Sequence, residues 1–328
     1  MKLLVVGVGS IGRKHAMNAV NYSVVGIVDS NDRKADEVAK ECNSISFGDD
    51  LEKALKWGCD GVIVATPNKF HIEVAIKAIK SGADVLIEKP ISYDTKLAKE
   101  FLDYAESINR KVYVVCNMRF HPAVNTLQKY LHIIGKPLFA RAHYGNYLPD
   151  QRPNTDYRKL YVSNAEEGGV VLDAIHELDY LSWFFGSIKN IFGDVSHISS
   201  LEIKSDDYAG LIVKHESNVR SEIHLDYLRR VKRRGCEISG ADGLLHWISE
   251  GKSPEHCIVR SYTPDFGWKI LLDEPDLDDS SSMKNLIKEF VLSLNGKQNR
   301  LQTGQEALIL LNATLAARTG DESARKIS

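Results

Sequence analysis

A glycine pattern at the end of the first apolar run constrains this chain more than any other feature of its sequence. The run Lys2–Val8 ends in Gly7-x-Gly9-x-x-Gly12, and a segment of helical period, Ile11–Val20, follows at once. The first glycine permits a tight turn, the second lets the backbone approach a pyrophosphate, and the third lets the helix pack closely on the strand. The N–H groups and positive dipole at the start of the helix then favour phosphate. The pattern therefore predicts a strand–turn–helix unit that binds a dinucleotide.

The acid that ends the next apolar run bears on which dinucleotide binds. Asp29 lies 17 residues after Gly12, where an acid hydrogen-bonds the adenosine ribose. A carboxylate at this place repels the 2′-phosphate of NADP, so NAD is the favoured cofactor and NADP the less favoured one. In the alternative, Arg33 or Ser30 accommodates that phosphate while Asp29 turns aside. The cofactor contacts expected from this unit are the three glycines, Asp29, Ser10, Ile11 and Ser30.

The first 120 residues alternate between short apolar runs and amphipathic stretches. Because the runs are continuously apolar, they are typical of strands buried on both faces. Strand–helix–strand units of this kind build a parallel sheet with right-handed crossovers. The expected strands are Lys2–Val8, Val24–Asp29, Gly61–Ala65, Val85–Ile87 and Val112–Cys116, and the expected helices are Ile11–Val20, Asp32–Glu41, Leu51–Trp57, Phe70–Lys80 and Thr95–Asn109.

After Phe120 the pattern changes to period-2 segments with little between them, which indicates a mostly antiparallel sheet. The sequence thus predicts two domains, a dinucleotide-binding domain over residues 1–120 and an α/β substrate domain over residues 121–328. The strands expected in the second are Pro137–Asn146, Ile191–Ile198, Tyr208–Lys214, Val219–Tyr227, Cys236–Ser239 and Gly243–Ile248, and the helices are Ala123–His132, Gly169–Phe185, Met283–Leu294 and Gly304–Ala317.

Composition argues against several classes of protein. The 328 residues carry 42 Lys and Arg against 44 Asp and Glu, a formal net charge of −2, so no nucleic-acid partner is expected. No apolar run reaches the roughly 18 residues that a membrane helix needs, so no membrane partner is expected either. The five cysteines are scattered and the histidines form no metal-binding pattern. We therefore expect neither disulfides nor a metal site, and a cytoplasmic location is the simplest interpretation.

Two further strand ends carry residues of unusual chemistry. One is followed by Thr66-Pro67-Asn68, with His71 one turn on, and the other by Glu88-Lys89-Pro90. Ligands of open parallel sheets lie beyond the carboxyl ends of the strands. His71 is either a cofactor contact or only the first residue of a helix. The cofactor contacts expected here are Thr66, Pro67, Asn68, His71, Glu88 and Lys89.

Four segments together form a set that resembles one protein family. They are GVGSIG with Arg13-Lys14-His15 after it, ATPNKFH, Glu88-Lys89-Pro90, and GGVVLD at residues 168–173. The set resembles the Gfo/Idh/MocA oxidoreductases, relatives of glucose–fructose oxidoreductase and inositol dehydrogenase, over nearly the whole chain. The resemblance implies a Rossmann domain followed by an α/β domain with a large open sheet. It also implies NAD(P)-dependent chemistry on a sugar or polyol, and a homo-dimer or homo-tetramer formed through that sheet.

The resemblance also implies which residues form the site. Lys89 matches the family lysine between nicotinamide and substrate, and Asp173 and His176 resemble its second-domain pair. Asn117 and Arg119 match the segment that leaves the sixth strand near the nicotinamide. Many members place the histidine four residues after the aspartate, whereas here the interval is three. The sequence therefore leaves open whether Lys89 or His176 carries the proton.

These residue types suit hydride transfer from a carbinol, because a positioned base must take the remaining proton. Lys89 serves if burial or a neighbouring cation lowers its pKa; in the alternative it forms a structural ion pair. On one continuous helix, Asp173 and His176 are neighbours, and Asp173 orients the imidazole and fixes its tautomer. In the alternative, the Asp–His pair only ties this helix to a loop.

The loop before that helix offers groups for an acidic ligand. Arg152 and Arg158 present planar guanidinium groups that bind carboxylate or phosphate through two hydrogen bonds, and Tyr157 precedes Arg158. We expect these three residues to contact a sugar acid or a nucleotide-sugar, with exposed loop charges as the alternative. The basic run over 229–234 and the acidic run Asp273–Asp279 are interpreted as solvated turns and edges.

Three functions are consistent with these residues. The leading one is an NAD(H)-dependent oxidoreductase that acts on a sugar, polyol, sugar acid or nucleotide-sugar. The second uses NAD without net redox and oxidises its substrate transiently for hydrolysis or epimerisation. The third is a non-catalytic NAD(H)-binding sensor, because fold alone does not fix function; Lys89, Asp173 and His176 argue against it.

Overall fold

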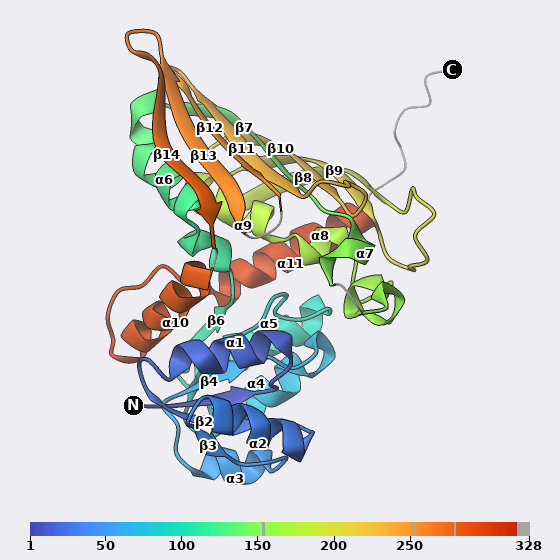
Figure 1. Cartoon of the computed structure of the whole chain (residues 1–328), viewed down its shortest axis with the longest axis vertical. Coiled ribbons are helices and arrows are strands. Elements are labelled where there is room, and N and C mark those ends of the chain that lie inside the picture. Colours follow the sequence, from blue (N-terminus) through green and yellow to red (C-terminus); the bar gives the residue numbers. More distant parts are fainter. Residues whose placement is uncertain (153–154, 252–253, 279, 320–328) are drawn as a thin grey trace. The chain divides into compact units, whose positions relative to one another are not determined.

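The computed structural model describes residues 1–152, 155–251, 254–278 and 280–319 (Figure 1). The chain forms two compact units: a first unit of Met1–Phe120 with Ser280–Leu308, and a second unit of His121–Asp279 with the chain from Ile309. The first boundary between these units falls after Phe120. The segment 280–308, which the prediction assigned to the second domain, belongs to the first unit.

The first unit contains a sheet of seven strands in the order β15-β6-β5-β4-β1-β2-β3. All neighbouring strands are parallel except β15, which is antiparallel to β6. The very short strands β3 and β15 were not predicted. The strands are β1 Lys2–Val6, β2 Val24–Val28, β3 Ile45–Ser46, β4 Gly61–Val64, β5 Asp84–Ile87, β6 Val112–Val114 and β15 Gln302–Thr303.

Helices cover this sheet, and one of them comes from the far end of the chain. The buried side chains of Met283, Leu286, Ile287 and Phe290 follow helical spacing and join the same core as Leu3 and the helices α1 and α2. This packing is the reason why residues 280–308 belong to the first unit. The helices are α1 Ser10–Ala19, α2 Asp32–Glu41, α3 Leu51–Lys56, η1 Asn68–Phe70, α4 His71–Lys80, α5 Thr95–Ser107, η2 Asn117–Phe120, α10 Ser280–Leu294 and the start of α11 Gly304–Arg318.

The second unit contains an eight-stranded sheet in the order β14-β13-β12-β11-β7-β10-β9-β8. Only the central pair β7 and β10 is parallel, so the sheet is mostly antiparallel as predicted. The hairpin of β13 and β14 was not predicted. The strands are β7 Pro137–Gly145, β8 Ile188–Ser196, β9 Tyr208–His215, β10 Arg220–Asp226, β11 Arg233–Gly240, β12 Leu244–Glu250, β13 Glu255–Thr263 and β14 Gly267–Leu277.

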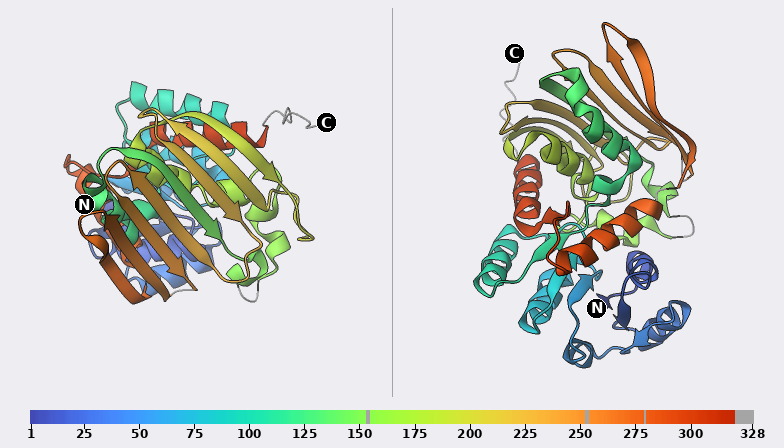
Figure 2. Two further views of the ribbon diagram at one scale, coloured as in Figure 1. Left: turned by 90° about the horizontal axis from the view of Figure 1, so that it is seen from above. Right: turned by 90° about the vertical axis from the view of Figure 1, so that its left-hand side faces the viewer.

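Helices contact one face of this sheet, which we call the inner face. The helices α6, α8 and α9 pack there, and in Figure 2 no helix among the described residues lies on the other, outer face. Buried side chains such as Ala142, Cys236 and Trp247 occupy the inner face. The helices of this unit are α6 Pro122–Tyr130, η3 Leu131–Ile134, α7 Leu148–Gln151, η4 Tyr157–Lys159, η5 Tyr161–Ser163, α8 Val170–Asp173, α9 His176–Phe185 and the rest of α11.

The helix predicted over Gly169–Phe185 is wrong in one respect, because the structure breaks it in two. Helix α8 ends at Asp173, the backbone of Ala174 leaves helical geometry at φ −95° and ψ 33°, and α9 begins at His176. No glycine or proline lies at this break, and the apolar period of the sequence continues across it. The sequence therefore predicts one continuous helix. The argument that Asp173 and His176 are neighbours on one continuous helix therefore no longer holds.

All five cysteines are free thiols, and all five are buried. Within the described part of the chain, no helix is both long enough and apolar enough to span a membrane.

Candidate functional site

The carboxyl ends of the parallel strands bring the predicted cofactor residues to one edge of the first sheet. Strand β1 lies between β4 and β2, and β5 lies beyond β4. Gly7, Asp29, Thr66 and Glu88 each follow one of these four strands closely, so they line one edge. At β1 and β4 the strand order reverses, which is where open sheets of this type bind ligands.

The three glycines meet different physical requirements. Gly7 has φ +84°, a backbone conformation that residues with a side chain rarely adopt. A Cβ on Gly12 would collide with the carbonyl oxygen of Gly7, so helix α1 packs directly against the turn. A Cβ on Gly9 would meet no heavy atom within 4 Å, and no described side chain caps the helix that Gly9 precedes. The start of α1 therefore fits a pyrophosphate, with the N–H groups of Ser10 and Ile11 at its first turn.

Asp29 links the glycine turn to the end of β2. Its Oδ2 accepts a hydrogen bond from the N–H of Val8 at 2.7 Å, and its Oδ1 accepts one from the N–H of Asn31 at 2.9 Å. A carboxylate has about four acceptor positions, so these two bonds leave capacity for ribose hydroxyls. Asp29 is half-buried and Ser30 is exposed beside it. This arrangement fits NAD at the predicted place.

A buried histidine holds the acid that precedes Lys89. His15 on α1 is fully buried, and its Nε2 lies 2.7 Å from Oε1 of Glu88. The other carboxylate oxygen of Glu88 accepts a hydrogen bond from the N–H of Lys89 at 3.2 Å. The turn that bears Lys89 is thus fixed to the helix that follows the glycine pattern. In the sequence His15 is distinguished only as part of the segment after the glycine pattern, so this contact was not predicted.

His71 connects the two loops that follow β4 and β5. Its Nε2 lies 2.9 Å from the carbonyl oxygen of Thr66, and its Nδ1 lies 3.0 Å from that of Pro90. Burial lowers the pKa of His71, although both carbonyl groups act against that change. The ring is 1% exposed, so its contacts within the chain hold Thr66-Pro67-Asn68 against the Lys89 turn. A direct contact of His71 with the cofactor stays a prediction.

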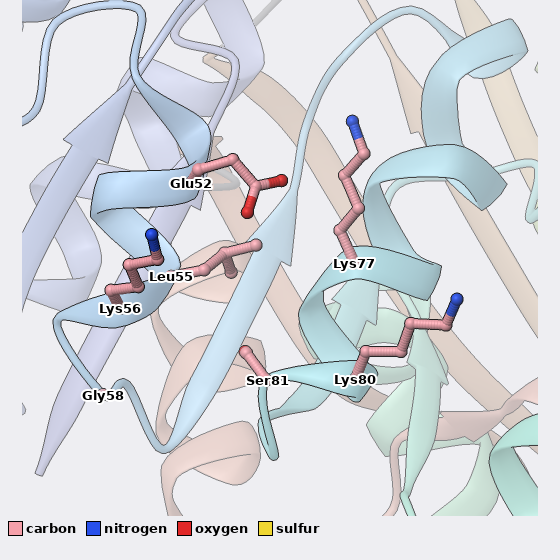
Figure 3. Close-up of a pocket in the computed structure, with 7 residues that line it drawn as sticks. All are labelled: Glu52, Leu55, Lys56, Gly58, Lys77, Lys80 and Ser81. Carbon is pink, nitrogen blue, oxygen red and sulfur yellow. The ribbon is translucent and has the colours of Figure 1, made fainter.

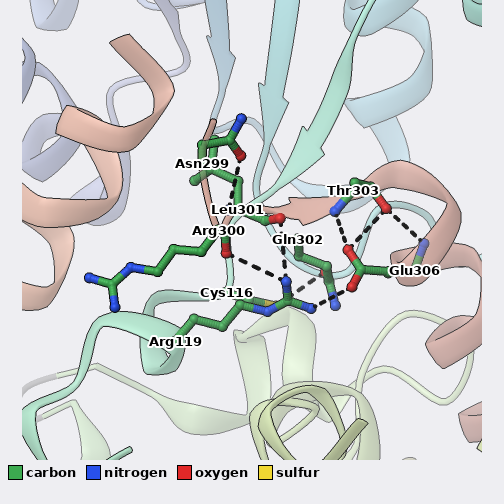
Figure 4. A network of polar contacts seen from close by, with 8 residues as sticks. All are labelled: Cys116, Arg119, Asn299, Arg300, Leu301, Gln302, Thr303 and Glu306. Atoms are coloured by element: carbon green, nitrogen blue, oxygen red, sulfur yellow. Dashed lines mark hydrogen bonds and ion pairs between the residues drawn. The ribbon is translucent and has the colours of Figure 1, made fainter. Parts of the chain in front are cut away.

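Arg119 has partners within its own unit (Figure 4). The side chain is 2% exposed, and its Nη1 donates to the carbonyl oxygen of Leu301 at 3.3 Å while its Nη2 lies 3.2 Å from Oε1 of Glu306. Nearby, Sγ of Cys116 donates to Oε1 of Gln302 at 3.2 Å. This network holds β15 and the start of α11 against η2, in which Asn117 is half-buried. Cofactor contacts of Asn117 and Arg119 stay predictions.

In the second unit a tyrosine binds the candidate aspartate. The hydroxyl of Tyr161, on η5, donates to Oδ1 of Asp173 at 2.8 Å. Asp173 ends α8, His176 begins α9, and all three side chains are half-buried. Tyr161 was not predicted, because no period or motif marks it.

Next to His176, a buried ion pair ties α9 to the sheet. Glu177 is fully buried, and its Oε1 lies 2.8 Å from Nε of Arg234 on β11. The guanidinium of Arg234 stacks 4.4 Å above the ring of Tyr144. The prediction that the basic run is a solvated turn is therefore wrong for Arg234. The alternation that places Cys236 and Ile238 on the inner face also places Arg234 there, so this signal was available in the sequence.

The predicted loop contacts are distributed unevenly. Arg158 is exposed, and its guanidinium pairs with Asp156 at 2.8 Å and with Glu202 at 2.7 Å. The side-chain hydrogen bond from Arg158 lowers the pKa of Asp156. The hydroxyl of Tyr157 accepts a hydrogen bond from the N–H of Glu202 at 3.3 Å, and Arg152 is exposed. The loop residues 153–154 lie outside the described part, and the substrate contacts stay predictions.

A cavity of about 480 Å³ in the first unit lies at the opposite edge of the sheet (Figure 3). Gly58 and Ser81 line it, and they precede β4 and β5 rather than follow them. The side chains of Lys77 and Lys80 are turned away from one another in Figure 3. This cavity is therefore separate from the glycine turn. Over the described ranges, no group of three or more His, Cys, Asp or Glu side chains is placed to hold a metal ion.

Two family models match the chain in succession. Residues 1–116 match the model of the oxidoreductase family with an NAD-binding Rossmann fold, and residues 132–246 match the GFO/IDH/MocA C-terminal domain. The chain belongs to the GFO/IDH/MocA oxidoreductase family. The predicted resemblance, the predicted fold class and NAD as the cofactor of this GFO/IDH/MocA protein are thereby confirmed.

Relatives of this GFO/IDH/MocA protein include named dehydrogenases. It is 34% identical over 130 residues to UDP-N-acetylglucosamine 3-dehydrogenase of Acidithiobacillus ferrooxidans, covering 39% of this chain and 41% of that protein. It is 27% identical over 200 residues to the NAD(+)-dependent scyllo-inositol 2-dehydrogenase of Bacillus subtilis, covering 57% and 54%. The chain therefore matches only about half, or less, of the length of each of these two relatives.

A solved structure extends the likeness to the whole fold. The structure of the Acidithiobacillus ferrooxidans UDP-N-acetylglucosamine 3-dehydrogenase matches with a TM-score of 0.79, covering 98% of each chain at 22% identity. At this identity the match shows the fold of the GFO/IDH/MocA protein and not its substrate.

Proposed function

We propose that this chain is an NAD(H)-dependent oxidoreductase that moves a hydride to or from a carbinol of a sugar, polyol, sugar acid or nucleotide-sugar. The observation that carries the proposal is the fixed position of Lys89. Its turn follows β5, is bound to the glycine-turn helix through Glu88 and His15, and is bound to the loop after β4 through His71. Such preorganisation suits a residue that must meet a reacting carbon.

In this proposal the chain's own side chains position the substrate and handle one proton. NAD, when bound, accepts or supplies the hydride. Lys89 takes the carbinol proton at Nζ during oxidation and, in reduction, returns it to the oxygen. Asp173 and His176 bind the substrate hydroxyls, and His176 is the alternative carrier of the proton. Arg152, Tyr157 and Arg158 contact the acidic part of the substrate.

The names of the relatives indicate a class of substrate. One relative is named for UDP-N-acetylglucosamine and another for scyllo-inositol, both of which carry neighbouring hydroxyls on a six-membered ring. A substrate of this type offers several hydroxyls to polar side chains such as Asp173 and His176. We therefore propose a ring polyol or hexose derivative.

The proposal is tested by assaying the purified protein with NAD⁺ at 340 nm against scyllo-inositol, UDP-N-acetylglucosamine, glucose 6-phosphate and sugar acids. The expected result is one NADH formed for each product molecule with at least one substrate. Turnover with catalytic NAD⁺ and no net NADH would instead favour transient oxidation. Tight NADH binding without turnover of any compound would favour a sensor.

We also propose that the protein works in the cytoplasm, where its five free thiols stay reduced.

We further propose that two or more copies associate through the outer face of the second sheet. Large apolar side chains are exposed on this face: Phe192 is 63% exposed, Ile212 54% and Ile270 66%. The strand register extends a single row of side chains across all eight strands. From β14 to β8 the row reads Ile270, Arg260, His246, Glu237, Arg141, Glu222, Ile212 and Phe192.

The composition of this row supports a second copy as the partner. Both of its ends are apolar, and its middle carries charges of both signs, with Arg141 paired to Glu222 at 2.7 Å. A two-fold interface places the same surface on both partners, so it must be self-complementary. A row that is apolar at both ends and mixed in charge at its centre meets this requirement.

A further inference from the structure

Helix α8, which ends at Asp173, is fixed at its beginning by groups far away in the sequence. The carbonyl oxygen of Asp206 accepts a hydrogen bond from the N–H of Val170. The side-chain Oδ2 of Asp206 accepts another from the N–H of Val171 at 3.0 Å. The other carboxylate oxygen of Asp206 pairs with Arg318 at 2.7 Å, and Arg318 also donates to the carbonyl oxygen of Gly168. The backbone of the candidate aspartate is therefore held independently of its own side chain.

The backbone of Tyr161 is also fixed to its surroundings. The carbonyl oxygen of the next residue, Val162, accepts hydrogen bonds from the N–H of Gly169 at 2.8 Å and from the hydroxyl of Ser205 at 2.6 Å. The carbonyl oxygen of Ser163 accepts a hydrogen bond from the N–H of Lys204. The segment that carries Tyr161 is thus bound to the start of α8. This arrangement leaves the Tyr161 hydroxyl to act on the Asp173 carboxylate, to which it donates at 2.8 Å.

We propose that Tyr161 is a positioning residue that holds the Asp173 carboxylate in the orientation needed for substrate, an inference that rests on the proposed function. A hydrogen bond from a neutral donor to one oxygen restricts rotation of the carboxylate. The other oxygen is thereby held in one direction, in which it can meet a substrate hydroxyl. Bonds to charged groups contribute roughly 1.5–3 kcal/mol, which corresponds to about a tenfold to a hundredfold change in rate. If Tyr161 acts through Asp173, as proposed, its effect must vanish once that carboxylate is removed.

A second tyrosine provides a matched control. Burial and, after it, the charge of Asp173 raise the pKa of the Tyr227 phenol, so this phenol lies within electrostatic range of the carboxylate. Tyr227 is fully buried, and among the described residues its hydroxyl has no hydrogen-bond partner. Tyr227→Phe therefore removes a hydroxyl from the same neighbourhood without removing a bond to Asp173.

The test is a double-mutant cycle of Tyr161→Phe and Asp173→Asn, with Tyr227→Phe as control. It uses whichever compound of the panel above turns over fastest, and it measures kcat, KM and the affinity for NADH. We expect Tyr161→Phe to lower kcat about tenfold or more while the NADH affinity stays that of the wild type. Asp173→Asn should lower kcat further, and the double variant should be no slower than Asp173→Asn alone. Tyr227→Phe should keep kcat within about twofold of the wild type.

Each other outcome has a definite meaning. If Tyr161→Phe keeps the wild-type kcat, or if its loss adds fully to that of Asp173→Asn, Tyr161 does not position the carboxylate and the inference is wrong. If Asp173→Asn itself keeps full activity, or no compound turns over, the proposed function fails and the inference fails with it. Thermal unfolding of each variant separates these results from loss of folding, and the cycle in unfolding midpoints reports the Tyr161–Asp173 contact even for a variant of reduced stability. Additive midpoint losses would also contradict the contact.

Discussion

The missing side chains of Gly9 and Gly12 serve two different purposes. At Gly12 the absent Cβ makes room for the carbonyl oxygen of Gly7, so the requirement for glycine arises from packing. At Gly9 no described atom lies within 4 Å of the place of a Cβ, so no described part of the chain requires glycine there. Alanine at these two positions should therefore separate folding from cofactor binding.

We predict that Gly9→Ala keeps the thermal midpoint of the wild type but weakens NADH binding about tenfold or more, because the methyl group occupies the phosphate approach. Gly12→Ala should lose roughly 1–3 kcal/mol of stability or more through overpacking. Fluorescence titration with NADH and thermal unfolding measure the two effects. Wild-type NADH affinity in Gly9→Ala would show that the pyrophosphate does not lie over this turn.

Residues whose roles follow from local geometry were predictable from the sequence, whereas residues that act over long distances along the chain were not. The glycines and Asp29 lie where a strand–turn–helix unit must place them. By contrast, Arg119 contacts the carbonyl oxygen of Leu301 across 182 positions, and no period predicts such a contact. Tyr161 reaches Asp173 from an irregular segment 12 positions earlier, for the same reason.

At the scale of elements, apolar periodicity predicted most helices and strands but neither their interruptions nor their polar members. It located the helical segment around Met283 but not the sheet that this helix covers. It missed β14, an edge strand in which apolar Trp268 and Ile270 are exposed and polar Asp273 and Glu274 follow them. The break after Asp173 leaves no sign in the apolar period of the local sequence.

A buried acid joins three elements of the second unit. Glu255 begins β13 and is 5% exposed; its Oε2 lies 2.7 Å from Nζ of Lys232, and its Oε1 lies 3.7 Å from Nε2 of His121 before α6. Burial by itself would raise the pKa of Glu255, but the hydrogen bonds and charges of His121 and Lys232 outweigh it and lower the pKa from 4.5 to about 2. The ionised carboxylate therefore stabilises the fold.

We predict that Glu255→Gln destabilises the protein by about 3 kcal/mol, because it leaves a partly buried lysine unpaired. Since the folded pKa lies below the unfolded one, the contribution of Glu255 is complete above about pH 4.5 and is lost as the pH falls toward 2. Urea unfolding from pH 7 to pH 3 measures both. Glu250→Gln, which removes an exposed pair with Arg233, is the control and should cost at most about 1 kcal/mol. Equal losses in the two variants would refute this account.

At the scale of the whole molecule, each unit is built from two separate stretches of chain. No helix among the described residues lies on one face of the second sheet. The composition of that face is informative, since the face of a sheet that is exposed to water normally carries polar residues. Here large apolar side chains stand at both ends of a row whose centre is charged. This pattern is what the proposed self-association needs.

We predict that Ile212→Glu converts the oligomer to a monomer, because a charge placed among buried apolar contacts carries a large desolvation cost. Val231→Glu is the matched control, since Val231 is similarly exposed, at 62% against 54%, but lies in a loop between β10 and β11. Sedimentation velocity at micromolar concentration distinguishes the species. A wild-type monomer, or an unchanged oligomer in Ile212→Glu, would exclude this face as the interface.

Replacement of Lys89 by methionine, followed by parallel measurements of NADH binding and of substrate turnover at 340 nm, tests the proposed chemistry most directly. Methionine keeps an unbranched stem and removes only the ammonium group. We predict NADH affinity equal to that of the wild type and a loss of about 10³-fold in kcat, within the usual range for a general acid–base group. Turnover within a few-fold of the wild type would contradict the assignment, because the proton would then have another carrier.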